Sequence, residues 1–129
     1  MKFVYINLIT GWIAVLGGVM SGAVMGLFFH DTGWMGGYGS YRRRLLRLGH
    51  IAFFGLGFMN LVYALSAGTM PVPTPFAQIA SAGLVAGVLT MPLVCFLTVW
   101  REKFRHLFPV PVFSILTAVV CVLAGWWVQ

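Results

Sequence analysis

The sequence predicts an all-α integral membrane protein, an up-down bundle of four transmembrane helices. Charged residues make up 8% of the 129 residues and hydrophobic residues 60%. A water-soluble domain needs a charged and mixed surface, and so few polar groups do not suffice to cover one. The charges are also confined to two islands, Asp31–Arg47 and Arg101–Arg105, apart from Lys2. By its length the chain, residues 1–129, is expected to form a single transmembrane domain.

Three stretches contain no Lys, Arg, Asp, Glu or His: Phe3–Phe29, Ile51–Trp100 and Leu107–Gln129. They are 27, 50 and 23 residues long, and a spanning helix takes about 20 apolar residues. The middle stretch therefore holds two spans, and the proline-rich segment Met70–Pro75 predicts the reversal between them. We expect spans at about residues 8–29, 48–67, 76–100 and 107–128.

Four residues carry local predictions. Ser40 follows a glycine-rich loop and is expected to cap the helix that leads into the second span. Asn60 lies deep in that span, where its amide needs a partner on another helix because lipid offers none. Cys95 and Cys121 both fall inside spans, and we expect buried free thiols rather than a disulfide.

The first span contains Gly18, Gly22 and Gly26 in i, i+4, i+8 register. Residues four apart lie on the same side of a helix, and glycine lets a second backbone come close. We therefore expect these three residues to form a packing groove, a glycine zipper. Its occupant is another span of this chain, a second copy or a foreign subunit.

The basic residues predict the orientation. Positive residues in short loops mark the cytoplasmic side, and seven of the eight lie in the two loops on one side of a four-span bundle: Arg42, Arg43, Arg44, Arg47, Arg101, Lys103 and Arg105. Only Lys2 disagrees. We expect a bacterial-type inner membrane, cytoplasmic charged loops and termini on the periplasmic side. The net charge of +6 is then assigned to topology and to anionic headgroups, not to nucleic acid.

The histidines suggest a cofactor site at the cytoplasmic side. His30 is expected at the end of the first span, His50 about one turn inside the second, and His106 at the start of the fourth. One hypothesis is a b-type haem ligated by His50 and by His106 or His30. Its propionates would meet Arg43 or Arg47, which share a helix face with His50.

Two other interpretations stay open. In a quinone pocket, His50 would donate a hydrogen bond to a quinone carbonyl among Phe53, Phe54 and Phe58. Alternatively His50 is a buried polar group bonded to a neighbouring helix, and the other two histidines are ordinary interfacial residues. An ionisable group within a span is nevertheless a functional candidate by default.

Several kinds of chemistry lack a motif. His30, Asp31, His50 and His106 come from three segments without the spacing of a metal site, so no metal site is predicted. The glycine-rich loop lacks a preceding strand and a Gly-Lys-Ser/Thr ending, so no nucleotide site is predicted. No Ser/His/Asp or Cys/His arrangement supports nucleophilic catalysis, and we expect a chain that is not catalytic by itself.

Together these observations favour a small subunit or accessory protein that packs into a larger membrane complex. A respiratory or other electron-transfer assembly is the expected host, because the His/Arg cluster would border a haem or quinone. The alternative is a stand-alone redox protein that binds haem b or quinone. A transporter of a small solute or metal is a less favoured alternative. The expected partners are membrane lipids and other membrane subunits, with no nucleic acid.

Overall fold

The computed structural model describes residues 2–128, and its long elements are all helices. They are α1 (Lys2–Gly26), α2 (Tyr41–Ser66), α3 (Thr74–Trp100) and α4 (Pro109–Trp127). Two short 3₁₀ helices, η1 (Trp34–Gly36) and η2 (Glu102–Leu107), lie in the connections. The described residues form no strand, and four helices are long and apolar enough to cross a membrane. The prediction of an all-helical fold with four span-like helices is confirmed.

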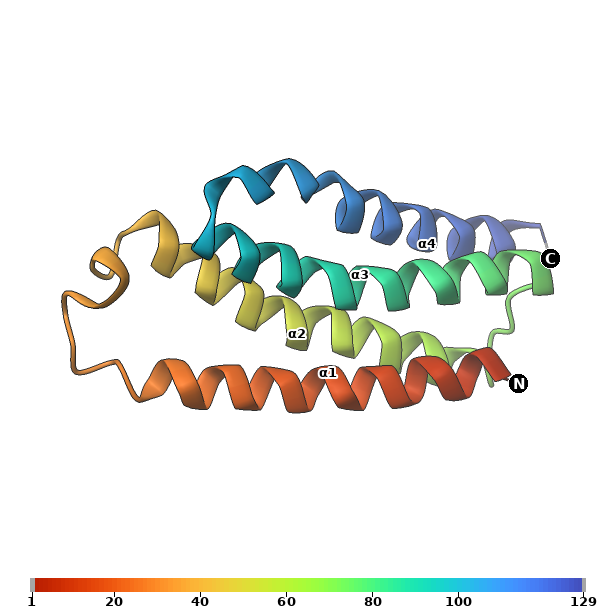
Figure 1. Ribbon diagram of the computed structural model, residues 1–129. Helices are drawn as coiled ribbons and strands as arrows, with labels where there is room; N and C mark the ends of the chain where they lie inside the picture. Colours follow the sequence, from red (N-terminus) through yellow and green to blue (C-terminus); the bar gives the residue numbers. More distant parts are fainter. Residues whose placement is uncertain (1, 129) are drawn as a thin grey trace.

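The four long helices alternate in direction (Figure 1). Both termini lie at one end of the molecule, which we call the terminal end, and the α1–α2 and α3–α4 connections lie at the other. Because the basic islands lie in or beside these connections, we call the second end the basic end.

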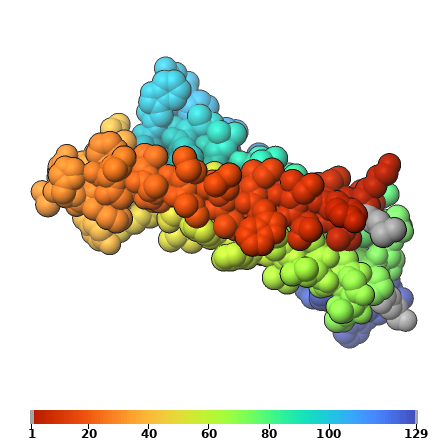
Figure 2. Space-filling model, turned by 90° about the horizontal axis from the view of Figure 1, so that it is seen from below, coloured from red at the N-terminus to blue at the C-terminus, as the bar shows by residue number. Residues whose placement is uncertain are grey.

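The helices form an open row rather than a closed ring. α3 is central: α2 and α4 both pack against it, and α1 packs against α2 and also reaches α3. Within residues 2–128, no Cα atom of α4 lies within 8 Å of one in α1 or α2. Figure 2 shows α1 running across the visible face, with cyan to light-blue atoms from the region where α3 joins α4 projecting on one side.

Two helix ends differ by a few residues from the predicted span boundaries. α1 ends at Gly26, and Phe28 and Phe29 in the turn after it form i→i−3 hydrogen bonds, the tighter pattern common at helix ends. His30 lies in the same turn, just beyond α1. His106 lies in η2 and precedes α4, because Pro109 takes the first helical position, where its missing N–H costs nothing.

The predicted cap of α2 is confirmed. Ser40 has an extended backbone, and its Oγ accepts a hydrogen bond from the backbone N–H of Arg43 at 3.2 Å. The same hydroxyl donates to the carbonyl oxygen of Met35 at 2.7 Å. Ser40 thus fixes both the first turn of α2 and the preceding loop.

Glycines bring α1 and α2 together, but the predicted stripe is only part of the contact. The backbones come close at Gly11 and Gly57, where a Cβ atom built on Gly57 would lie 3.2 Å from the Gly11 carbonyl oxygen. Gly18 and Gly22 face side-chain rings of α2 rather than its backbone. A Cβ built on Gly26 would meet nothing within 4 Å.

α4 is attached through small residues of α3. A Cβ on Gly83 would lie 2.6 Å from the carbonyl oxygen of Ser114 and 2.9 Å from the Cβ of Ala118. Ala118 itself is completely buried against Leu84 and Ala80. These contacts hold α4 close along α3.

A hydrogen-bonded cluster, which we call the polar joint, ties α1, α2 and α3 together. The Asn7 amide donates to Asn60 Oδ1 at 2.7 Å, and the Ser81 hydroxyl donates to Asn7 Oδ1. Asn60 Nδ2 in turn donates to the carbonyl oxygens of Leu84 at 3.2 Å and Leu56 at 2.9 Å. Asn7 and Asn60 are both 0% exposed. The prediction that Asn60 needs a partner on another helix is confirmed.

The two cysteines are free thiols, as predicted. Cys95 is fully buried and close to Gly49 of α2, whereas Cys121 of α4 is only partly buried. The thiol of Cys95 thus fills space in the α2–α3 interface.

Candidate functional site at the basic end

Arg43 and Arg47 of α2 hold the loop that joins α1 to α2. The Arg47 guanidinium lies 4.3 Å from the centre of the Tyr38 ring and donates to the Tyr38 carbonyl oxygen at 3.1 Å. The Arg43 guanidinium lies 5.5 Å from the same ring and 5.4 Å from the Trp34 ring. The two arginines predicted for haem propionates are thus brought together by loop aromatics.

Backbone geometry places those aromatics. Met35, Gly36 and Gly37 have φ angles of 54°, 84° and 91°, so three consecutive residues have positive φ values. This conformation is rare for residues other than glycine. Trp34 immediately precedes the reversal, and its ring stacks on Phe28 at 4.8 Å with an interplanar angle of 4°.

Arg43 is the most unusual charge in the molecule, because its side chain is only 5% exposed. In the part of the chain that the structure describes, its guanidinium has ring contacts but neither a hydrogen bond nor an ion pair. Its nitrogens all keep some exposed surface, since none of them is both buried and without a partner. The guanidinium therefore has N–H donors available for an anion.

His50 faces α1 rather than another histidine. Its Nδ1 lies 3.0 Å from the Ser21 hydroxyl, which also donates to the Gly18 carbonyl oxygen at 3.0 Å. The His50 ring covers Gly22 and meets Phe54 edge-on at 5.3 Å between ring centres. This arrangement matches the interpretation of His50 as a polar group bonded to a neighbouring helix.

The other two histidines lie away from His50. His30 and His106 are both exposed, one after α1 and the other before α4, two helices that do not pack on each other. Neither has a hydrogen bond or ring contact to His50 among residues 2–128. Over the same residues, no three His, Cys, Asp or Glu side chains gather closely enough to hold a metal ion.

The aromatic residues proposed for a quinone are also divided. Phe54 contacts His50, whereas Phe53 packs on Gly17 and lies 6.1 Å from the Phe96 ring. Phe58 is exposed and lines a groove near the terminal end.

A cavity of about 470 Å³ lies at the basic end. Its wall is mostly apolar and comes from α1, the connecting loop, α2 and α3: Met20, Ser21, Val24, Met25, Phe28, Trp34, Met35, Leu46 and Phe96. Ser21 links this cavity to His50, and Trp34 links it to Arg43. We call it the basic-end cavity.

Comparison with protein-family models, curated proteins and solved structures finds no match for this chain.

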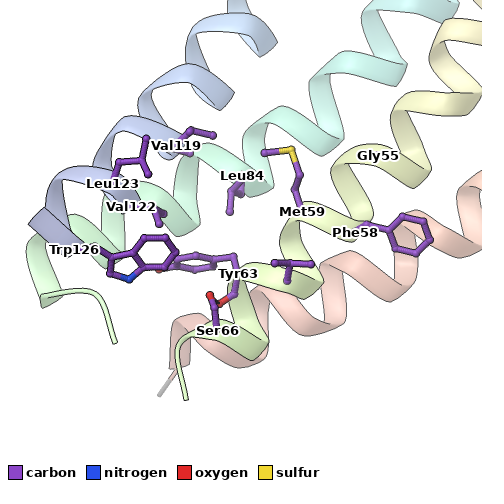
Figure 3. Close-up of a pocket in the computed structure, with 12 residues that line it drawn as sticks. Gly55, Phe58, Met59, Tyr63, Ser66, Leu84, Val119, Val122, Leu123 and Trp126 are labelled. Atoms are coloured by element: carbon purple, nitrogen blue, oxygen red, sulfur yellow. Dashed lines mark hydrogen bonds between the residues drawn. The ribbon is translucent and has the colours of Figure 1, made fainter. Parts of the chain in front are cut away.

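A second hollow, which we call the α2–α4 groove, lies between α2 and α4 towards the terminal end (Figure 3). Its volume is about 360 Å³, and Leu84 of α3 lies between its two walls. Tyr63 of α2 and Trp126 of α4 both line it. Their polar atoms are engaged elsewhere, Tyr63 with the Ala77 carbonyl at 2.9 Å and Trp126 with the Met70 carbonyl at 3.0 Å.

Sequence reasoning missed Asn7 and the whole α2–α4 groove. Asn7 was detectable, because an asparagine in an uncharged apolar stretch signals a buried hydrogen bond. The groove had no such signal, since it depends on which helices are neighbours.

Proposed function

We propose that this chain is a small integral membrane subunit or accessory protein, and that the α2–α4 groove receives a helix of another membrane protein. The observation that carries the proposal is Gly55. It lines the groove and is exposed, and a Cβ atom built on it would meet nothing within 4 Å. Small residues in membrane helices occur where a second helix comes close.

The shape of the molecule supports this proposal. Of the other three long helices, only α3 has Cα atoms within 8 Å of α4, so the α2–α4 side is open along the groove. Most of the groove wall is apolar, and the polar atoms of Tyr63 and Trp126 already have partners inside the chain. A helix that enters the groove therefore needs only an apolar face, which can pack closely against Gly55.

Membrane residence and orientation belong to the same proposal. The four helices have the length and composition of spans, and the basic residues gather at one end. We infer an inner-membrane protein whose basic end faces the cytoplasm and whose termini face the periplasm. We further propose an electron-transfer assembly as host, because the basic end combines an imidazole, guanidiniums and an apolar cavity.

The test is complex formation with a pair of matched glycine variants. Digitonin-solubilised membranes are run on a native gel, and the wild type is expected in a complex well above its own 14.2 kDa. Gly55→Leu is expected to release the chain from that complex. Gly26→Leu should not, since Gly26 is equally uncontacted but lies outside the groove.

Three results would contradict the subunit proposal. The wild-type chain migrates alone, or Gly55→Leu remains in the complex, or two differently tagged copies account for its entire mass. Circular dichroism and thermal unfolding of the purified Gly55→Leu protein must match the wild type, so that lost assembly reflects the groove.

The stand-alone redox alternative is tested separately by absorption spectroscopy of the dithionite-reduced protein. A b-type haem would give a sharp band near ~560 nm. That band, lost in His50→Ala, would replace the subunit proposal by a redox protein with its own cofactor.

A further inference from the structure

We propose that the basic-end cavity and Arg43 together bind one anionic phospholipid, with the lipid phosphate at the guanidinium and an acyl chain in the cavity. The inference requires the chain to reside in a membrane. It does not depend on a partner helix in the α2–α4 groove, which lies towards the other end of the molecule.

The first argument is the incomplete environment of Arg43. Its side chain is 5% exposed, and its two described partners are the Trp34 and Tyr38 rings. A guanidinium carries five N–H donors and keeps its charge. Stacking on aromatic rings leaves the donors at its edge unused. None of its nitrogens is both sealed off and without a partner, so an anion can reach them from the surface.

The second argument is that the charge and the cavity are adjacent. Trp34 lines the cavity and also lies under the Arg43 guanidinium. Leu46 lines the cavity as well, and it follows Arg43 by three residues on the same side of α2. The cavity volume of about 470 Å³ falls within the ~300–1,000 Å³ typical of small-molecule pockets. A ligand with a charged head and an apolar tail fits this combination.

The third argument is the sign of the charge around the site. Arg42, Arg44 and Arg47 occupy the same first turns of α2, at the helix end whose dipole is positive. The nearest acidic residue in the loop, Asp31, accepts a hydrogen bond from the Gly33 backbone at 2.9 Å. This environment attracts a phosphate and repels the ammonium group of a zwitterionic headgroup. Arginine also matches phosphate geometry, with paired N–H donors.

An uncharged quinone satisfies fewer of these features. Its ring and tail suit the apolar wall, and Ser21 with His50 offers a polar contact. It would nevertheless leave the charge of Arg43 without a counterion. The phospholipid accounts for both the cavity and the arginine.

The experiment is native mass spectrometry of the purified protein in dodecyl maltoside, titrated with phosphatidylglycerol or with phosphatidylcholine of the same acyl chains. We expect one phosphatidylglycerol per chain, bound at least about tenfold tighter than phosphatidylcholine. Arg43→Met should weaken this binding by about tenfold or more, the loss typical of a hydrogen bond to a charged group.

The chain offers a matched control in Arg101, which also lies over a tryptophan, 5.3 Å from the Trp100 ring, but is exposed. Arg101→Met should change the affinity by less than about twofold, as expected for an exposed charge. A second variant, Val24→Trp, places bulk in the cavity from an exposed position of α1. It should reduce phosphatidylglycerol binding without altering the helical content, which keeps the test decisive if Arg43→Met fails to fold.

Several outcomes would overturn the inference. These are equal binding of the two lipids, unchanged binding in both Arg43→Met and Val24→Trp, or an equal loss in Arg101→Met. Displacement of the lipid by equimolar glycerol 1-phosphate would show a site for soluble phosphates instead. Recovery of one quinone per chain by solvent extraction of the purified protein would assign the cavity to that ligand.

Discussion

Replacing Asn60 by leucine tests the polar joint, because Asn60→Leu removes a fully buried amide while keeping a similar volume. It removes the hydrogen bond from Asn7 at 2.7 Å and the bond to the Leu84 carbonyl at 3.2 Å. Interhelical hydrogen bonds in membranes contribute about 0.6 kcal/mol each, so the two bonds amount to about 1 kcal/mol. The Asn7 amide is 0% exposed and would then lack an acceptor, which costs about 1–3 kcal/mol more.

We therefore expect Asn60→Leu to lower the free energy of unfolding by about 2–4 kcal/mol. The assay is reversible unfolding by dodecyl sulfate in mixed micelles, followed by far-ultraviolet circular dichroism. Thr98→Val is the matched control. Thr98 is also 0% exposed, but its hydroxyl donates at 2.6 Å to the Val94 carbonyl of its own helix. Its loss should cost less than about 1 kcal/mol, as for one local hydrogen bond.

A double-mutant cycle with Asn7→Leu completes the test. In each single variant, the remaining amide loses its hydrogen-bond partner. In the double variant, both amides are removed, so neither is left unpaired in this way. The double change should therefore cost about 1 kcal/mol or more less than the sum of the single changes. Additive costs, or an Asn60→Leu protein as stable as Thr98→Val, would refute the assignment of the polar joint as the link between α1, α2 and α3.

Three further changes test the α1–α2 contact, the loop and the orientation. Gly22→Leu should cost about 1–3 kcal/mol by overpacking at the His50 ring, whereas Gly26→Leu should leave the unfolding free energy unchanged; equal effects would contradict the described contact. Arg47→Met should speed hydrogen exchange in the loop before α2 about fivefold, because a stacking contact and a hydrogen bond are lost; unchanged exchange by mass spectrometry would refute this. A cysteine at Ser40 should escape a membrane-impermeant thiol reagent applied from the periplasm, whereas one at Thr74 should react; the opposite pattern would reverse the proposed orientation.

The sequence was sufficient for the features that depend on composition and local chemistry. Uncharged stretches of span length predicted four helices, and Ser40 predicted the start of α2 to the residue. Asn60 predicted an interhelical hydrogen bond, because an amide has the same requirement wherever its helix lies. None of these predictions needed to know which helices are neighbours.

The glycine stripe shows why the remaining features were harder. Seven residues return a helix to within about 20° of its starting direction, but eight leave it about 80° away. Gly11 and Gly18 therefore share the face that packs on α2, whereas Gly26 has turned away from it. The spacing of the glycines along the sequence was therefore read correctly, but the side of α1 on which each glycine lies was not.

The candidate site was predicted only in part, for the same reason. The sequence placed Arg43, Arg47 and His50 on one face of a helix, but the residues opposite that face come from elsewhere. The loop aromatics Trp34 and Tyr38 reach the arginines only because positive φ angles reverse the chain after η1. The partner of His50 is Ser21 of α1, and helix periodicity alone does not specify that choice.

The attachment of α4 divides the molecule into parts of unequal rigidity. Three helices are locked by buried amides, whereas the fourth packs along α3 and is secured at its far end by the Trp126–Met70 hydrogen bond and the contact of Gly125 with Val72. We expect thermal motion of α4 to widen or narrow the α2–α4 groove without disturbing the packing of α1, α2 and α3. A partner helix with slightly larger or smaller side chains would then be accommodated by a movement of α4 alone. Binding at this site would therefore tolerate variation in the sequence of the partner.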